Sequence, residues 1–367
     1  MKTFRDEVSV GGEDGFVAFC SVGMLIPGII CGEARPRFWR AKLKGGDVFV
    51  TAVIAVFACA FSPSTQAQEK PEPTAEELEW IQEITTIAPG EYRDLRPVRI
   101  DFGLSWNNVF NAGELAVILE QSTEPSERLW IGRAEGRSNG LARALWPYDV
   151  EATSRIHPQS LQPSLFQLSE TERGKKYRYQ LTFEPAKVRT RTIILPKTKG
   201  EDEAADPEVK ESTYRYEAIQ DILSTALLLR SQSLEKGDSV KMLVSPFNRP
   251  YYTEFKSHGR EERKVKGDSY DTIRLGVTIR KVNHNKTLQD YDKMKEATIW
   301  LSDDEFRLPV EIHADIFVGF VSARAEKRQW LDGSETKKES GAKAEEPKKS
   351  SGGFLQKITG GKKAGGE

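Results

Sequence analysis

Two residues of opposite charge, Asp221 and Arg230, are the first candidates for chemistry in this chain. They fall in a segment predicted to be helical, and a polar pair on a helix could line a ligand pocket. Their nine-residue separation corresponds to about 13 Å along a helix, which is too far for a direct ion pair. Asp at the start of a helix and Arg at its end are also favoured by the helix dipole. We therefore expect a structural role, and we retain both residues as candidate ligand contacts.

An acidic run, Ser302-Asp303-Asp304-Glu305, is the second candidate. Clustered carboxylates could bind calcium, which takes several oxygen ligands, or could serve as an acid and a base. The run lacks the alternating spacing and the glycine of a calcium-binding loop. Asp and Ser also bond to their own backbone in turns. We expect a turn, and we assign neither a metal site nor a catalytic residue to the run.

The histidines offer little support for catalysis or metal binding. No pair among His157, His258, His284 and His313 has the spacing of a two-histidine motif on a helix or a strand. The chain also has no Gly-x-Ser-x-Gly elbow, no phosphate-binding loop and no dinucleotide-binding glycine pattern. We expect no metal and no cofactor, and the motifs lean against an enzyme. A hydrolase stays an alternative, because catalytic triads need no proximity in sequence.

Aromatic residues form the last candidate group. Trp106 and Tyr252 are retained as ligand contacts beside Asp221 and Arg230. Aromatic side chains on strands mostly pack in the core. A minority could line a groove for a glycan or a lipid, and these are the partners that we expect.

The segment 48–67 has the pattern of a secretory signal. Basic residues at 35–44 precede an apolar core at 48–61, and small residues follow up to Ala67, after which we expect cleavage. The core of 14 residues is shorter than the roughly 20 that a spanning helix needs. An uncleaved membrane anchor at 48–61 is one alternative, and lipidation at Cys59 is another. The predicted location is periplasmic or secreted, with membrane contact only through such an anchor.

Composition narrows the chemistry further. All three cysteines, Cys20, Cys31 and Cys59, precede the predicted cleavage site, so the mature chain has no disulfide and no thiolate. Removing the 7 basic and 6 acidic residues of the first 67 from totals of 54 and 55 leaves 47 and 49. Such a balanced charge, together with export, indicates that nucleic acid is not a partner.

Most of the mature chain alternates between apolar and polar residues, which is typical of β-strands with one buried face. The first such segment is 98–106, and similar segments lie at 177–183, 188–194, 240–244, 251–255, 273–279, 297–301 and 308–316. Short strands joined by polar turns favour an antiparallel meander. The predicted fold is therefore mainly β, a curved sheet that forms a half-barrel or a barrel.

Two helices are expected beside this sheet. Apolar residues at steps of three and four define one stripe over 216–234, which predicts an amphipathic helix packed across the concave face. A short N-terminal helix is predicted after Thr74, whose spacing to Glu77 is that of a capping box.

The predicted organisation has four parts. Residues 1–67 form an N-terminal extension with the signal, 68–90 a linker with the short helix, and 91–332 the β-rich domain. Residues 333–367 are rich in Gly, Lys, Glu and Ser, which predicts a disordered tail. The charged segment 197–211 is predicted to be a mobile loop.

Several short motifs together resemble a bacterial family of exported proteins known as domain of unknown function 3108. The motifs are Phe102 to Trp106, Ala112-Gly113-Glu114, Asp149 to Ser154, Leu161-Gln162-Pro163, Gln220 to Ser224 with Arg230, Leu301 to Asp304, Leu308-Pro309-Val310 and Gly319. The resemblance covers about residues 90–328. It implies a secreted or periplasmic β-rich domain, and it implies no reaction.

Three functions remain open. The first is a non-catalytic binding module whose cleft between helix and sheet holds a hydrophobic or amphipathic envelope ligand. Such a ligand would need an enclosed volume of about a few hundred cubic ångströms. The second is an envelope interaction protein that uses the basic tail 333–367. The third is a hydrolase whose site the sequence does not reveal.

Overall fold

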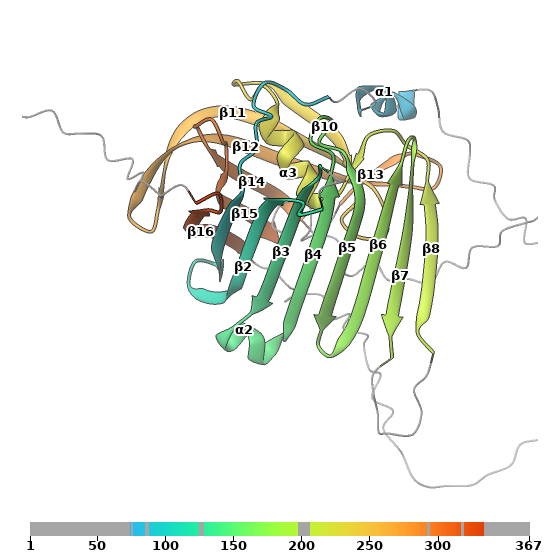
Figure 1. Cartoon of the computed structure of the whole chain (residues 1–367), viewed down its shortest axis with the longest axis horizontal. Helices are drawn as coiled ribbons and strands as arrows, with labels where there is room; N and C mark the ends of the chain where they lie inside the picture. Colours follow the sequence, from blue (N-terminus) through green and yellow to red (C-terminus); the bar gives the residue numbers. More distant parts are fainter. Residues whose placement is uncertain are drawn as a thin grey trace, which may run out of the picture.

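The structure, a computed structural model, describes residues 74, 76–84, 88–124, 128–196, 206–291, 294–316 and 319–333. Within these residues the strands form a single sheet of 16 members. The sheet is strongly curved and open, which confirms the predicted mainly β, half-barrel fold (Figure 1).

The strands are β1 (Val98–Trp106), β2 (Phe110–Gln121), β3 (Trp130–Ser138), β4 (Tyr148–Ile156), β5 (Pro163–Glu172), β6 (Lys175–Glu184), β7 (Lys187–Leu195), β8 (Glu208–Tyr214), β9 (Ile219–Gln220), β10 (Ser239–Val244), β11 (Tyr251–Val265), β12 (Asp268–Val282), β13 (Leu288–Asp290), β14 (Met294–Ser302), β15 (Pro309–Ile316) and β16 (Phe320–Trp330). The helical elements are η2 (Glu76–Leu78), α1 (Trp80–Ile84), α2 (Gly140–Leu145) and α3 (Ile222–Ser231).

The chain enters the sheet in its middle and builds it outward in two directions. From β1 a meander runs through β2 to the free edge at β8, and we call β1–β8 the first wing. The chain then crosses to the other edge at β9 and returns through β10, β11, β12, β14 and β15 to β16, which pairs with β1; we call β9–β16 the second wing. The ladders are antiparallel except for the short parallel pair of β9 and β10.

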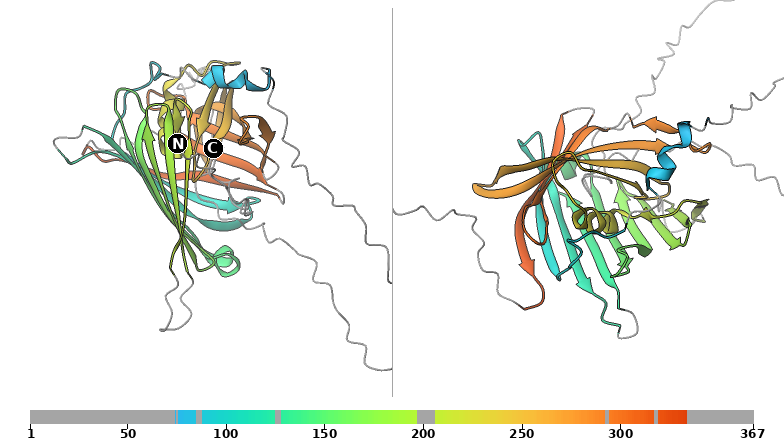
Figure 2. Two further views of the ribbon diagram at one scale, coloured as in Figure 1. Left: turned by 90° about the vertical axis from the view of Figure 1, so that its right-hand side faces the viewer. Right: turned by 90° about the horizontal axis from the view of Figure 1, so that it is seen from above.

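Helix α3 lies inside the curve, between the two wings, as the view from above shows (Figure 2). This confirms the predicted place of the helix on the concave face. The predicted bounds of 216–234 were too wide, because Ile219 and Gln220 belong to strand β9 and the helix ends at Ser231. The expected amphipathic stripe was also wrong: nine of the ten helical residues are buried, since both wings cover the helix.

The face of the sheet that meets α3, here called the inner face, carries the predicted alternation. Val98, Ile100, Phe102 and Leu104 of β1 are each 4% exposed or less, whereas the residues between them are half-buried. On β2 the partners of Val98 and Phe102, Leu119 and Leu115, are also buried. On β16 Ala323 opposite Leu104 is buried, whereas the partners nearer Trp330 are half-buried. The dry side of each strand therefore forms one core around α3.

Strands β2, β3, β4, β5 and β16 are among those that the periodicity did not predict, and the inner-face residues of β3 explain why that strand was missed. Gly132, Ala134 and Gly136 occupy the inner positions of β3, where a large apolar residue would have marked the strand. A Cβ atom on Gly132 would lie 3.3 Å from Cβ of Leu223 in α3. Small residues at this point leave room for α3 against the strand. The alternation of large apolar and polar residues that would indicate a strand is therefore absent from the sequence here.

The short N-terminal helix is present as η2 and α1, and α1 lies on the outer face of the second wing. Trp80 of α1 packs edge-on against Tyr252 with a centroid distance of 5.7 Å. Glu83 of α1 accepts from Nζ of Lys241 at 2.7 Å. The predicted loop 197–211 was partly wrong, because residues from Glu208 onward form the edge strand β8.

Several predictions concern segments outside the described residues. These are the signal with Cys59, the linker up to residue 73 and the tail from residue 334. No helix among the described residues combines the length and the apolar character needed to cross a bilayer.

Candidate functional site

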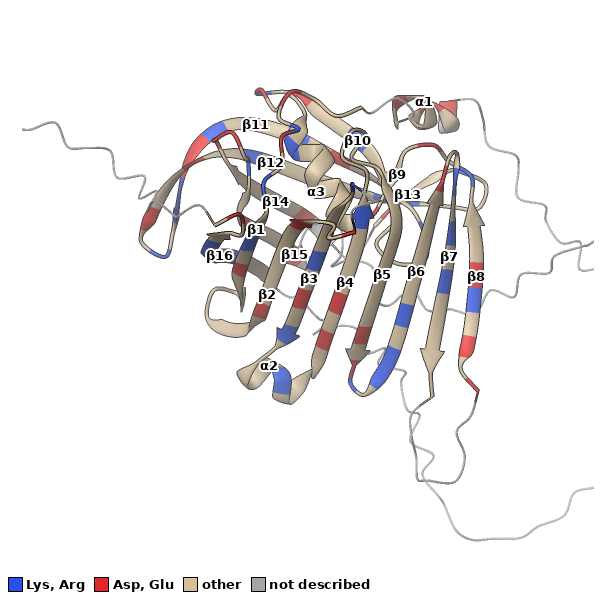
Figure 3. Ribbon diagram, viewed as in Figure 1, with Lys and Arg blue, Asp and Glu red and all other residues tan. Residues whose placement is uncertain are grey.

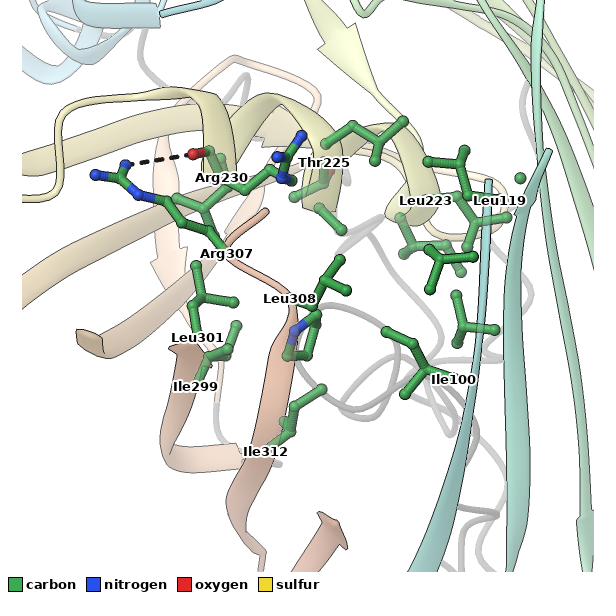
Figure 4. Close-up of a pocket in the computed structure, with 18 of the residues that line it drawn as sticks. Ile100, Leu119, Leu223, Thr225, Arg230, Ile299, Leu301, Arg307, Leu308 and Ile312 are labelled. Carbon is green, nitrogen blue, oxygen red and sulfur yellow. Dashed lines mark hydrogen bonds between the residues drawn. The ribbon is translucent and has the colours of Figure 1, made fainter. Parts of the chain in front are cut away.

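An apolar cavity between α3 and the inner face is the candidate site. Its volume is about 140 Å³. Side chains of β1, β2, β4, β11, β14 and β15 line it together with α3, so both wings contribute (Figure 4). The lining is aliphatic and aromatic except for Thr225, Arg230 and Arg307. The arrangement can therefore hold an apolar group by desolvation, with two cations at one end.

The volume of this cavity is smaller than the few hundred cubic ångströms expected for an enclosed ligand. It is close to the roughly 150 Å³ of an apolar cavity that holds benzene. A slender apolar group fits such a space, whereas a whole lipid does not.

Arg230 is the one residue of the four candidates that lines the cavity. It is 4% exposed, and its guanidinium donates to three backbone carbonyls: Nη1 to Asp94 at 3.0 Å, Nη2 to Glu305 at 3.2 Å, and Nε to Phe306. Burial, together with the nearby Arg307, lowers the pKa of Arg230 to about 10. The group thus stays charged at neutral pH, and it joins the end of α3 to the turn between β14 and β15.

A second buried arginine, Arg307, sits beside it and was not predicted. It is 2% exposed, and Nη1 donates to the carbonyl oxygens of Gln232 at 2.6 Å and Arg230 at 3.4 Å. Its guanidinium carbon lies 3.3 Å from the ring centroid of Tyr92. The two arginines therefore contact backbone oxygens and an aromatic ring, and these contacts close one end of the cavity. Only the order Phe306-Arg307-Leu308, with a cation between apolar residues, signals this burial in the sequence.

Asp221 lies outside the cavity lining and caps α3. One carboxylate oxygen accepts from the backbone N–H groups of Leu223 and Ser224, each at 2.8 Å, and the other accepts from Oγ of Ser154 on β4 at 2.5 Å. Full burial raises the pKa of Asp221 to about 6, against the lowering effect of these hydrogen bonds. The geometry agrees with the structural role that we expected, and the residue also links α3 to the first wing.

The two aromatic candidates lie elsewhere. Tyr252 is on the outer face of β11, where its hydroxyl donates to Oε2 of Glu83 at 3.3 Å. Burial, followed by the charge of Glu83, raises its pKa. Trp106 ends β1, and its ring centroid lies 6.0 Å from that of Phe110. The structure thus places only Arg230 at the cavity, and the other three predicted residues lie apart from it and from one another.

The acidic run forms the predicted turn between β14 and β15. Oδ1 of Asp304 accepts from the backbone N–H groups of Phe306 and Arg307 at 2.9 and 2.8 Å, and Asp303 pairs with Nε of Arg260 at 2.8 Å. His313 lies on β15, 3.1 Å from Asp315, and the other histidines are on separate strands or turns. Among the described residues no group of three or more metal-ligating side chains converges. The described residues therefore offer no cluster of metal-ligating side chains that would support the hydrolase alternative.

Sequence reasoning missed two buried carboxylates: Glu311 on β15, which pairs with Arg263 and Arg324, and Glu170 on β5. Glu170 is 3% exposed, and it accepts from the hydroxyls of Tyr148 at 2.7 Å and Tyr179 at 3.0 Å. Burial raises its pKa to about 7, although both tyrosines act in the opposite direction. Its position in phase with Phe166 and Leu168 was the signal that an acid points inward. Glu170 does not line the cavity, so it can hold a proton but has no contact with a ligand there.

A second hollow, of about 520 Å³, lies on the outer face of β1–β4 and is strongly charged (Figure 3). Two ion pairs form within it: Arg99 with Asp101 at 2.8 Å, and Arg137 with Glu114 at 2.5 Å. Asp149 and Glu326 of the lining pair with Arg143 and Lys266 outside it, so acids outnumber bases in the hollow. Such exposed charges are solvated, and the hollow offers little apolar surface to a hydrophobic ligand. The inner cavity is thus the better candidate for a ligand.

The protein is thus a curved antiparallel sheet wrapped around one buried helix, with an apolar cavity between the two. The family model described as "Protein of unknown function (DUF3108)" matches residues 99–326, which is more than half of the chain. The chain belongs to this family, as the motifs indicated. No curated protein matches the chain.

Two solved structures are similar to this chain. One is a beta-barrel-like protein of the domain of unknown function DUF1849 from Brucella abortus, at 9% identity and a TM-score of 0.42, covering 65% of this chain and 99% of that one. The other is a candidate exported protein with a YmcC-like fold from Bacteroides fragilis, at 7% identity and a TM-score of 0.25, covering 66% and 100%. Neither likeness identifies a ligand or an activity for this chain.

Proposed function

We propose that this protein is an exported, non-catalytic binding module that holds the apolar chain of an amphipathic envelope ligand in the inner cavity. The signal pattern at 48–67 supports export. The observation that carries the binding role is the lining of the cavity, which is apolar on both wings and on α3 except for Thr225, Arg230 and Arg307. An apolar pocket with few polar groups is the usual form of a small-molecule site.

The size of the cavity limits which part of a ligand can enter it. About 140 Å³ accepts the end of an alkyl chain, and the polar part of the ligand would remain outside. Arg230 and Arg307 lie at one end of the cavity, where they favour a neutral or anionic ligand over a cation. The tail alternative depends on residues that the structure does not describe.

Filling the cavity tests the proposal. Val117 lines the inner cavity and is half-buried, so Val117→Trp should occupy the space with little damage to the core. Lauric acid is a suitable probe, titrated by calorimetry against wild type, Val117→Trp and a surface control, Val209→Trp, on the edge strand β8. We expect saturable binding to wild type and the control, and at least tenfold weaker binding to Val117→Trp.

Native mass spectrometry of protein purified from the envelope provides the second measurement. A retained alkyl-bearing molecule, absent from Val117→Trp, would support the proposal. If wild type retains no such molecule and binds no lauric acid, or if the filled variant binds as well as wild type, the cavity is only a packing defect and the proposal fails.

A further inference from the structure

Exposed apolar side chains concentrate at one end of the first wing. Val109 is 73% exposed, Phe110 46%, Leu141 58% and Leu145 64%; these four residues, which we call the apolar rim, come from two separate elements. Val109 and Phe110 follow the turn between β1 and β2, and Leu141 and Leu145 lie on α2 (Figure 1). Single exposed apolar residues are ordinary, but a cluster of them usually marks a contact surface.

The two elements are adjacent and held in place. The backbone N–H of Asn139, which directly precedes α2, donates to the carbonyl of Ala112 on β2 at 3.3 Å. In the turn, Asn107 and Asn108 adopt left-handed backbone angles with φ of 50° and 55°. Oδ1 of Asn107 accepts from the N–H of Phe320 at 2.8 Å, and Oδ1 of Asn108 accepts from Oγ of Ser322 at 2.9 Å. The apolar rim is thus presented by an ordered turn that β16 supports.

Basic side chains adjoin the apolar rim. The turn 172–176 between β5 and β6 contains Arg173, Lys175 and Lys176 against a single acid, Glu172. It borders α2, because the N–H of Arg173 donates to the carbonyl of Pro147 at 2.9 Å and its guanidinium lies 4.5 Å from the ring centroid of Trp146. Figure 3 shows Lys and Arg on α2 and on this end of β6.

We propose that the apolar rim docks this domain onto an anionic lipid bilayer. Leucine, valine and phenylalanine at exposed tips can enter the boundary between headgroups and acyl chains, as the apolar face of an interfacial helix does. Lysine and arginine beside them are attracted to anionic headgroups. A bilayer is the occupant that satisfies both features at once. This contact is independent of the predicted signal or lipid anchor and of the inner cavity.

Site-specific fluorescence tests the proposal even if an anchor holds the protein on the membrane. The full chain with Cys20, Cys31 and Cys59 replaced by alanine offers a background without thiols. An environment-sensitive dye is attached at Val109→Cys, at Leu145→Cys, or at the control Leu331→Cys, which is 39% exposed at the other end of β16. The probes are vesicles of phosphatidylcholine alone or with about 30% phosphatidylglycerol.

We expect a blue shift and brighter emission at 109 and 145 with anionic vesicles, a weaker response at raised salt, and no response at 331. The double variant Leu141→Ser/Leu145→Ser, with the dye at 109, should need at least tenfold more lipid for the same response. No response at 109 and 145 overturns the proposal. So does an equal response at all three positions, or a response that grows with protein concentration in the absence of vesicles, which would identify a second copy as the occupant.

Discussion

Glu170 shows how a single buried carboxylate can make stability depend on pH. Its pKa rises from 4.5 to about 7, chiefly because burial disfavours the charged form. Between these two pH values the unfolded chain releases the proton and the folded protein retains it. The unfolded state is therefore favoured progressively as pH rises through this window.

We predict that the free energy of unfolding of wild type, relative to Glu170→Gln, falls as pH rises from 4.5 to about 7 and is constant above that. The full change is up to about 3 kcal/mol, because one pKa unit corresponds to about 1.4 kcal/mol. Urea unfolding at a series of pH values measures it. Glu135→Gln, an exposed residue on β3, is the control and should show no such trend. A difference between wild type and Glu170→Gln that does not vary with pH would contradict the assignment.

At the scale of elements, α3 and β3 are matched in shape. Gly132 leaves room for Leu223, and Ser154 on the neighbouring strand β4 donates to the cap residue Asp221 at 2.5 Å. The helix is therefore positioned by one close approach and one buried hydrogen bond on the first wing. Arg230 fixes its other end to the second wing through the carbonyls of Glu305 and Phe306.

We predict that Gly132→Val lowers the free energy of unfolding by about 1–3 kcal/mol, the usual cost of overpacking a core. The new Cβ would lie 3.3 Å from Leu223, and the two methyl groups would add to this crowding. Arg133→Val, at the next position on the outer face, removes an exposed ion pair with Glu120 and should change stability by less than about 1 kcal/mol. Urea denaturation compares the two. Equal effects would show that α3 does not pack closely on β3.

At the scale of the whole molecule, the first and the last strand of the chain, β1 and β16, pair in the middle of the sheet. Val98 of β1 is paired with Trp330 of β16, and the N–H of Leu331 donates to the carbonyl of Pro97 at 2.9 Å. The free edges belong to β8 and β9, which a long excursion of the chain separates from this seam. Because the first and last strands are neighbours, the same strand order could form if the chain began at another point.

A circular permutant should consequently fold. We predict that joining Gly333 to Thr74 through a flexible linker of about 20 residues, with new ends between Leu195 and Glu208, preserves cooperative unfolding and the strand-type circular dichroism spectrum. New ends between Gly103 and Leu104, inside β1, should abolish both, because β1 joins the two wings. Failure of the first permutant, or folding of the second, would contradict the role of the seam.

The sequence alone determined the fold class and much of the strand set. Apolar residues such as Ile100, Phe102, Ile273 and Leu275 face one side, and this periodicity is a local property of the backbone. The curved antiparallel sheet and the helix on its concave face followed from these local patterns, whereas the family resemblance rested on short motifs. The signal at 48–67 is equally local, but it lies outside the described residues.

Only the tertiary structure decided what surrounds α3. Strand β3 was missed because its inner-face Gly132 makes room for Leu223, about 90 positions away in the chain. Likewise Ser154 on β4 bonds to Asp221, about 70 positions away. Arg230 could be selected as polar, but its partners Asp94, Glu305 and Phe306 come from two other segments. The cavity, the buried Arg307 and the apolar rim depend in the same way on contacts between distant segments. Hydrophobic periodicity in the sequence indicates which face of a strand is buried. The size and charge of the side chains that pack against that face belong to segments far away in the sequence, so only the tertiary structure reveals them.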